Sequence, residues 1–240
     1  MDLLTTDTFF NGNISVKQNK NGYRFSIDAV LLAGHIKTNS GDRILDIGTG
    51  SGIISLILAY RNPQINIYGV EVQKSLADIA ALNVKDNNIE DRVKILCADI
   101  KNLKADMISG PLDIVVSNPP YRKAESGRVN SDNQRAVARH EIDVTLTDIL
   151  KAASRLLHVS GRFIIIYPSE RIADMVTQMR LSGIEPKHFR FIYSKSNSES
   201  KLVIVEGIKG GRTGAKVVSP LVIYCDDGTY TDEVNRMLMP

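Results

Sequence analysis

The sequence predicts an α/β protein whose core is a seven-stranded, mostly parallel sheet that ends in an antiparallel hairpin. Two observations support this fold class. From Arg43 onward, short apolar strands alternate with amphipathic helices. Continuous apolar strands separated by helices are typical of a parallel sheet that is covered on both faces. The last two expected strands are joined by residues 194–201, a polar link with no room for a helix, so these strands must pair in antiparallel fashion.

The expected elements follow one another in a regular order. The first forty residues contain two Asn-Gly pairs, Asn11-Gly12 and Asn21-Gly22, which indicate β-hairpin turns. A short helix follows, with apolar residues on one side: Ile27, Val30, Leu31 and Ala33. Strands are then expected at 44–47, 65–70, 93–96, 112–117, 162–167, 189–193 and 202–205, with helices at 52–60, 74–86, 146–157 and 170–181. A further strand is expected at 221–224.

Length and composition indicate a folded globular protein, and the order of the expected elements divides it into three parts. The chain has 240 residues, of which 43% are hydrophobic and 24% are charged, as in ordinary globular proteins. We expect an N-terminal hairpin or lid extension over residues 1–40. The α/β domain is expected over residues 41–209, and a small C-terminal tail packed on that domain over residues 210–240.

Several classes of protein are disfavoured by the sequence. Cys97 and Cys225 are the only cysteines and lack partners at ligand spacing, which argues against a zinc site or a disulfide framework. We expect both to be small buried residues, and we expect no metal. The N-terminus lacks the features of a signal peptide, and the longest apolar runs are far below the roughly 20 residues that cross a bilayer. We therefore expect a cytoplasmic protein without membrane contact.

A glycine-rich loop follows the first strand of the α/β pattern, over residues 46–52. Its glycines allow a tight turn and place backbone amides at the start of a helix, where a ligand can approach closely. The spacing is Gly-x-Gly-x-Gly, and Ile53 occupies the position that would complete a dinucleotide fingerprint. A P-loop lysine is also missing. The loop therefore favours a cofactor without a pyrophosphate, the alternative being a plain strand–helix connection.

Carboxylates end the next two strands. Glu71 lies about twenty residues past the glycines, where an acidic side chain can accept both hydroxyl protons of a ribose. Asp99 ends the third strand, where it can accept from an amino group while Ile100 packs beside a ring. The alternative for Glu71 is an exposed carboxylate at a strand end. Because parallel strands end at one edge, we expect these side chains to converge on one crevice.

A proline turn, Asn118-Pro119-Pro120-Tyr121, follows the fourth strand. The two prolines remove amide donors and leave carbonyl oxygens free, and Asn118 adds a neutral acceptor. Such a cluster suits an amino group on an sp² carbon, because hydrogen bonds from both N–H groups stabilise the positive charge that develops on the nitrogen. Tyr121 can stack on a planar substrate. The alternative is a rigid turn that only closes the strand.

Together these motifs resemble the Rossmann-like class I methyltransferases that depend on S-adenosylmethionine. The resemblance implies that the glycine loop holds the methionine moiety, with Asp46 near its amino group, that Glu71 holds the ribose and that Asp99 holds adenine. The resemblance also implies that residues 41–209 form the methyltransferase domain. The implied cofactor-binding residues are Asp46, Gly48, Thr49, Gly50, Gly52, Glu71, Val72, Asp99, Ile100, Phe25 and Asp28. Phe25 and Asp28 would cover the methionine end, or belong to a lid strand packed on the sheet.

The turn itself is typical of methyltransferases that modify planar amino nitrogens: adenine N6, guanine N2, or the glutamine amide of release factors. In this resemblance Asn118, Pro119, Pro120 and Tyr121 are the catalytic residues. The flanking segments are similar to those of the bacterial tRNA1(Val) adenine-N6-methyltransferase family, which modifies the adenine next to the anticodon. These segments are 22–32, Arg139-His140-Glu141, 220–224 and 228–231. The implied partner is tRNA, in which an anticodon loop offers unstacked bases.

Three alternatives stay open. Release-factor enzymes usually carry a separate helical N-terminal domain, which forty hairpin-like residues cannot supply. Guanine-N2 enzymes commonly follow the prolines with an aromatic residue and His, whereas here Arg122 follows Tyr121. The third alternative is an RNA-binding module with a relict methyltransferase fold, which would be expected to have lost part of the cofactor or catalytic motifs.

The charge distribution also points toward a phosphate-backbone partner. The net charge is only +3. Residues 119–140, however, hold five basic and two acidic residues, and residues 187–216 hold seven basic and two acidic ones. Concentrated positive charge in loop-rich segments is typical of nucleic-acid binding, although solvated surface loops are the alternative. We expect the substrate-binding residues to be Arg122, Lys123, Arg139 and Lys195.

Overall fold

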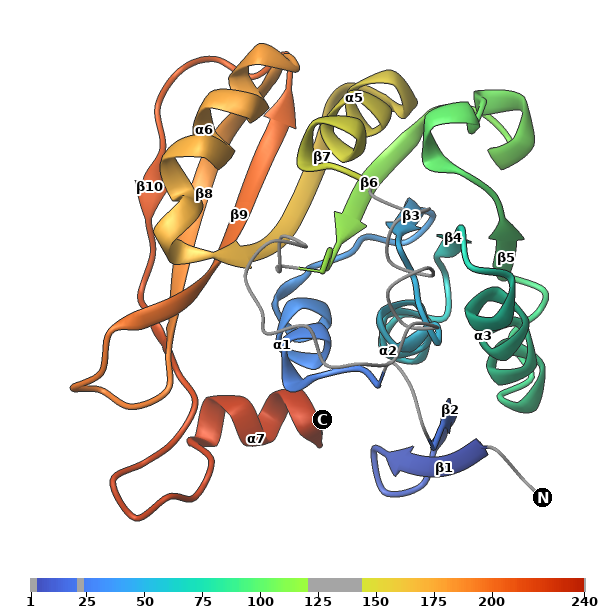
Figure 1. Ribbon diagram of the computed structural model, residues 1–240, viewed down its shortest axis with the longest axis horizontal. Coiled ribbons are helices and arrows are strands. Elements are labelled where there is room, and N and C mark those ends of the chain that lie inside the picture. Colours follow the sequence, from blue (N-terminus) through green and yellow to red (C-terminus); the bar gives the residue numbers. More distant parts are fainter. Residues whose placement is uncertain (1–3, 21–23, 121–143, 240) are drawn as a thin grey trace, which may run out of the picture.

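The structure is a computed structural model that describes residues 4–20, 24–120 and 144–239 (Figure 1). Its central sheet contains β3 (Arg43–Ile47), β4 (Asn66–Glu71), β5 (Val93–Cys97), β6 (Leu112–Ser117), β7 (Leu157–Pro168), β8 (Ile184–Tyr193) and β9 (Ser200–Lys209). The order is β8-β9-β7-β6-β3-β4-β5, in which β9 runs antiparallel to both of its neighbours and the other pairs are parallel. The α/β prediction is therefore confirmed, including the antiparallel hairpin.

Helices cover both faces of this sheet, as continuous apolar strands require. One face packs on α1 (Ile27–His35), α2 (Ile53–Arg61) and α3 (Lys74–Asp86), and the other on α5 (Leu146–Leu156) and α6 (Ile172–Leu181). Successive strand residues point to opposite faces. On β3, for example, Ile44 belongs to the first core and Leu45 to the second, and both are fully buried.

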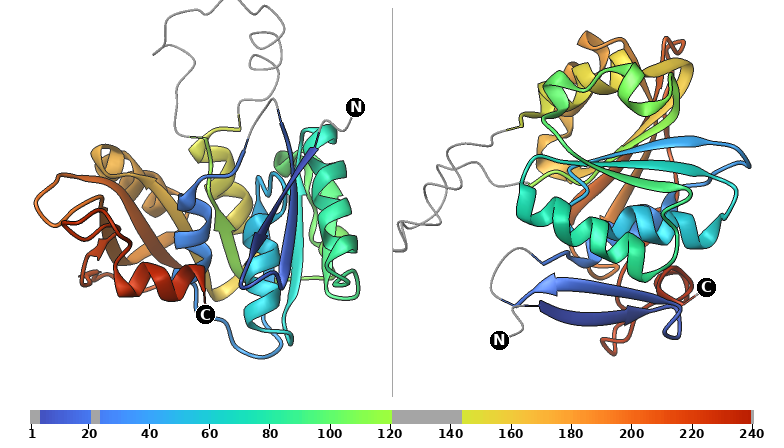
Figure 2. Two further views of the ribbon diagram at one scale, coloured as in Figure 1. Left: turned by 90° about the horizontal axis from the view of Figure 1, so that it is seen from below. Right: turned by 90° about the vertical axis from the view of Figure 1, so that its right-hand side faces the viewer.

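The N-terminal hairpin forms a small sheet of its own. Strands β1 (Leu4–Phe9) and β2 (Ile14–Asn19) pair in antiparallel register around a turn that holds the Asn11-Gly12 pair, which confirms the first hairpin prediction. Gly12 has a φ of 86°, which favours glycine. The hairpin lies against the layer formed by α2 and α3, apart from the main sheet (Figure 2).

The C-terminal tail extends the sheet and closes over α1. Strands β10 (Lys216–Val217) and β11 (Leu221–Val222) both pair with β8, so the expected strand at 221–224 is shorter than predicted. An unpredicted helix, α7 (Asp232–Leu238), packs on α1. Arg190 of β8 holds this helix through an ion pair of 2.6 Å with Glu233. The division into three parts at residues 40 and 209 stays a prediction.

Two details differ from expectation. Strands β8 and β9 are longer than the predicted segments 189–193 and 202–205. Apolar residues are concentrated in the last half of β8 and in the middle of β9, and the rest of each strand mixes polar and apolar residues. The expectation that both cysteines are buried is wrong, since both are exposed. Cys97 ends β5 at the sheet edge, and Cys225 lies in the tail beyond β11. Within the described residues, no helix is long and apolar enough to cross a membrane.

Candidate active site

The predicted site residues gather at one edge of the sheet. Strands β3, β4, β5 and β6 are parallel neighbours, so the segments that follow them meet at their carboxyl ends. The glycine loop follows β3, and Glu71 is the last residue of β4. Asp99 follows β5, and Asn118 follows β6. The expected convergence of these four features is therefore present in the structure.

The glycine loop turns sharply from β3 into α2. Gly48, Gly50 and Gly52 all have positive φ, at 71°, 58° and 87°, and Gly52 is the N-cap of α2. The amides of Gly48 and Thr49 bond to the carbonyl of Val70, which fixes the loop to β4. A Cβ added at Gly48 would meet no described atom within 4 Å, so open space borders the loop here.

The buried side chain of Asp46 stabilises this loop through hydrogen bonds. Its Oδ2 accepts hydrogen bonds from Thr49 Oγ1 at 2.7 Å and from Ser55 Oγ at 2.9 Å. Burial raises the pKa of the Asp46 carboxyl from 3.8 to about 6, although these two hydrogen bonds act in the opposite direction. The second oxygen, Oδ1, is buried and has no hydrogen-bond partner among the described residues. A cationic ligand group at this oxygen would compensate for the burial of the charge.

Glu71 is anchored by two backbone amides. Its Oε2 accepts from Gly50 N at 3.1 Å, and its Oε1 accepts from Gln73 N at 2.9 Å. These bonds tie the end of β4 to the glycine loop and orient the carboxylate. Because each carboxylate oxygen has two acceptor sites, the group can keep both amides and still accept hydroxyl protons. Val72 follows it and is half-buried.

Asp99 starts a short 3-10 helix, Ile100–Asn102. Its Oδ1 accepts from the amide of Lys101 at 2.9 Å, and its Oδ2 lies 3.4 Å from Lys101 Nζ. The side chain is 30% exposed, so it faces the solvent side of the sheet edge. Ile100 points the other way and is buried in the core beneath.

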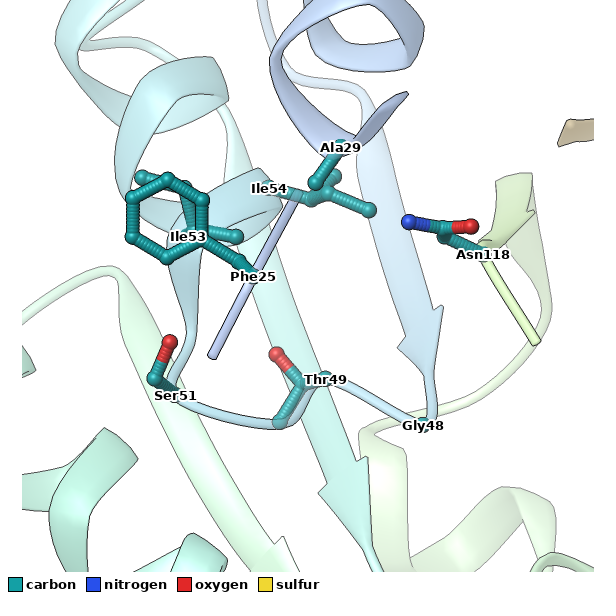
Figure 3. A pocket seen from close by; sticks show the side chains of 8 residues that line it. All are labelled: Phe25, Ala29, Gly48, Thr49, Ser51, Ile53, Ile54 and Asn118. Atoms are coloured by element: carbon teal, nitrogen blue, oxygen red, sulfur yellow. The ribbon is translucent and has the colours of Figure 1, made fainter. Parts of the chain in front are cut away.

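A pocket that is open to solvent lies between the glycine loop and the end of β6 (Figure 3). It is lined by Phe25, Ala29, Gly48, Thr49, Ser51, Ile53, Ile54 and Asn118. Phe25 was predicted, and Ser51 lies within the predicted loop, residues 46–52. Ala29, Ile53 and Ile54 were missed, although their positions in the first turns of α1 and α2, beside that loop, could have indicated them. Asp28 is half-buried in the first turn of α1 and does not belong to this lining.

The Asn-Pro-Pro turn begins directly at this pocket. Ser117 Oγ donates a hydrogen bond of 3.0 Å to the carbonyl of Ile47, which joins the ends of β6 and β3 and sets Asn118 beside the glycine loop. The Asn118 side chain lies across the pocket from Ser51 (Figure 3). Pro119 is buried and Pro120 is exposed. Tyr121, Arg122, Lys123 and Arg139 lie outside the described residues.

The basic residues of the second segment, 187–216, do not gather at one edge of the sheet. Lys195, in the β8–β9 turn, is at the carboxyl edge of the sheet and bonds to the carbonyl of Asp226. Lys209 ends β9 at the opposite edge and bonds to the carbonyl of Leu157. Arg190 is paired with Glu233. Lys195 and Lys209 are close in sequence but lie at opposite edges of the sheet, because β9 runs from one edge to the other between them.

Comparisons with known proteins agree with this geometry. The family described as "Methyltransferase small domain" matches residues 23–181. A tRNA1(Val) (adenine(37)-N6)-methyltransferase of Porphyromonas gingivalis is 29% identical over 99% of this chain and 95% of its own length. The protein of that name from Trichodesmium erythraeum is 34% identical over 71% of each chain. The crystal structure of a predicted O-methyltransferase from Agrobacterium tumefaciens has the same fold, with a TM-score of 0.71, 22% identity and coverage of 88% of this chain and 94% of that one.

Proposed function

The chain belongs to the methyltransferase small domain family and is an S-adenosylmethionine-dependent methyltransferase, and on this premise we propose that it methylates the N6 amino group of an adenine in RNA. The proposed substrate is a tRNA, modified in its anticodon loop. One observation carries the proposal: an Asn-Pro-Pro turn ends β6 beside a cofactor loop, in a chain similar over 99% of its length to a tRNA adenine-N6-methyltransferase.

The residues at the sheet edge fit the chemistry of the cofactor. Asp46 Oδ1 is a buried acceptor without a partner among the described residues, which suits the methionyl ammonium. Glu71 has acceptor capacity left for the ribose hydroxyls, and Asp99 is positioned at the next strand end for the adenine amino group. The pocket is bordered by the glycine loop, Phe25 and Asn118, so we assign it to the methionine end of the cofactor. When bound, the cofactor supplies an electrophilic methyl group on a sulfonium.

Asn118 and Pro119 are proposed to activate the target nitrogen. The lone pair of an exocyclic adenine amine is delocalised into the ring, which makes the amine a poor nucleophile. The Asn118 side-chain oxygen and the Pro119 carbonyl would accept its two N–H groups and stabilise positive charge on the nitrogen as it attacks. As the nitrogen–carbon bond forms, the sulfur–carbon bond breaks, and the proton leaves the nitrogen for water. No residue is needed as a strong base.

The remaining substrate assignments are proposals of the same kind. Tyr121 would stack on the adenine ring, and Arg122, Lys123, Arg139 and Lys195 would contact phosphates. Of these, Lys195 is the residue placed by the structure, at the carboxyl edge that also holds Asn118. Sheet order puts three strand spacings between β8 and β6, on the order of 14 Å, a distance that a folded RNA easily spans.

A transfer experiment tests the substrate class. The protein is incubated with S-adenosylmethionine labelled on the methyl group and, in separate reactions, with total tRNA, duplex DNA or a peptide release factor. We expect label in tRNA and only background label in the other two. Label in the release factor instead would favour glutamine N5 methylation and would overturn the proposal.

A further inference from the structure

The free edge of the N-terminal hairpin is completed by two asparagine side chains. Lys17 of β2 donates its amide to Asn83 Oδ1 at 2.7 Å and accepts from Asn83 Nδ2 at 3.0 Å. Ser15 forms the same pair of bonds with Asn87, at 3.0 and 2.7 Å. Asn83 lies in α3, and Asn87 is the C-cap of that helix, one turn later. Their side-chain amides bond to the backbone of β2 in the way that a neighbouring strand would.

Asn83 also makes a contact that Asn87 lacks. Its Nδ2 donates a second hydrogen bond, of 2.8 Å, to the carbonyl of Ser51 in the glycine loop. Asn83 is fully buried, so the loss of this side chain would leave the Ser51 carbonyl without its donor in a site closed to water. One amide group therefore joins the hairpin to the loop that lines the cofactor pocket.

Ser51 itself faces the pocket. It is one of the lining residues, and its Oγ is buried and has no hydrogen-bond partner among the described residues (Figure 3). A buried hydroxyl in a ligand pocket favours a hydrogen bond to the occupant. The position of this hydroxyl depends on the backbone of Ser51, which Asn83 holds.

The hairpin also bonds to a second pocket-lining residue, Phe25. Gln18 of β2 is buried, and its Oε1 accepts the amide of Phe25 at 3.0 Å. Its Nε2 donates to Asp7 Oδ2 at 2.6 Å, which ties this contact to β1. Phe25 also lines the pocket, on the same side as Ser51 (Figure 3). The hairpin thus bonds directly to Phe25, and it is joined to Ser51 through Asn83 of α3.

We propose that Asn83 is a positioning residue that couples docking of the N-terminal hairpin to occupancy of the cofactor pocket. The docked hairpin holds Ser51 and Phe25 in the arrangement that receives the cofactor. By reciprocity, a bound cofactor must strengthen the docking of the hairpin by the same factor. Asn87 anchors the hairpin without contacting the glycine loop, so it contributes to docking and not directly to the pocket.

The asparagine pair supplies a matched comparison. Asn83→Ala and Asn87→Ala each remove two hydrogen bonds to β2, and we expect both to lower the melting temperature of the ligand-free protein. Only Asn83→Ala also removes the bond to Ser51. We expect it to weaken binding of S-adenosylhomocysteine, measured by calorimetry, on the order of tenfold. Asn87→Ala should stay within about twofold of the wild type.

Hydrogen exchange of the wild-type protein tests the coupling without any substitution. Saturating S-adenosylhomocysteine should slow exchange of the Ser15 and Lys17 amides, neither of which lines the pocket. In Asn83→Ala this slowing should be lost, and in Asn87→Ala it should persist at Lys17. Unchanged exchange at Lys17 in the wild type would overturn the proposal. So would wild-type affinity in Asn83→Ala, or equal weakening of binding in the two variants.

Discussion

The two halves of the crevice are built in different ways. On the side of β3, β4 and β5, two carboxylates are held by hydrogen bonds within the site: Asp46 by Thr49 and Ser55, Glu71 by Gly50 and Gln73. On the side of β6, the chain leaves the sheet at Asn118, and the basic residues of β8 and β9 are spread over both ends of the hairpin. The half that we propose for the cofactor is a compact set of strand ends, whereas the half that we propose for the substrate extends over distant segments.

In the proposed function, this difference follows from the sizes of the cofactor and the RNA. A small cofactor is bound by atoms within a few residues of each strand end, so its site can be preorganised by local hydrogen bonds. An RNA is held by charges spread along its backbone, each of which contributes little to affinity. Substitutions on the side of β3, β4 and β5 should therefore change cofactor affinity, whereas substitutions on the side of β6, β8 and β9 should change turnover or tRNA binding.

The largest effect is expected for the catalytic turn. Asn118→Ala should lower kcat by about a hundredfold or more, because it removes an acceptor that acts on the nitrogen during transfer. Affinity for S-adenosylhomocysteine should change by less than about twofold. Single-turnover kinetics and calorimetry measure the two quantities. A variant with near wild-type rate would contradict the role given to Asn118.

Glu71→Ala should show the opposite pattern. Loss of charge-assisted bonds to the ribose should cost about 1.5–3 kcal/mol of cofactor affinity. Because Glu71 also accepts the amides of Gly50 and Gln73, the melting temperature should fall as well. Glu71→Gln is the matched control, since it keeps one acceptor oxygen at the same length, and it should lie between Ala and the wild type. Unchanged affinity in Glu71→Ala would show that the ribose is bound elsewhere.

Cofactor affinity should depend on pH through Asp46. Its pKa of about 6 means that roughly a tenth of the carboxyls are ionised at pH 5 and nine tenths at pH 7. If the ionised form receives the methionyl ammonium, affinity should rise about tenfold over this range. The folded protein holds the extra proton between pH 3.8 and about 6, so this group's contribution to the stability of the ligand-free protein falls as pH rises through that window.

Asp46→Asn should flatten this pH dependence, because an amide does not titrate and can still accept from Thr49 and Ser55. Calorimetric titrations of S-adenosylhomocysteine between pH 5 and pH 7 measure the effect. A wild-type affinity that stays constant over this range would contradict the placement of a cationic group at Asp46.

The smallest effect is expected in the substrate half. Lys195→Glu should weaken tRNA binding a few-fold and reduce the slope of log affinity against log salt by about 0.7–0.9. Lys37→Glu changes the net charge equally, but this exposed residue precedes β3, at the opposite edge of the sheet. It should have little effect on either quantity in a filter-binding assay. Equal effects of the two reversals would mean that RNA does not prefer the carboxyl edge.

The difference between the two sides of the crevice also explains which site residues could be predicted from the sequence. Gly48, Glu71 and Asn118 each follow an apolar strand directly, so local pattern and the rule of parallel strand ends are enough to bring them together. The bond between Ser51 and Asn83 was not identified, because it depends on how α3 packs beside the glycine loop. The segment around Lys209 was misjudged, since linear charge density ignores strand direction. Helix α7 is short, and its stability comes from packing on α1 rather than from its own pattern.

The Asn-Pro-Pro turn is proposed to act on adenine N6 in tRNA. This role is tested by digestion of tRNA after transfer of a labelled methyl group, followed by separation of the nucleosides by chromatography and mass spectrometry. The proposed role predicts that the label is found in N6-methyladenosine and is absent when Asn118→Ala replaces the wild type. Label in N2-methylguanosine, or in N6-methyladenosine at an unchanged rate with the variant, would contradict it.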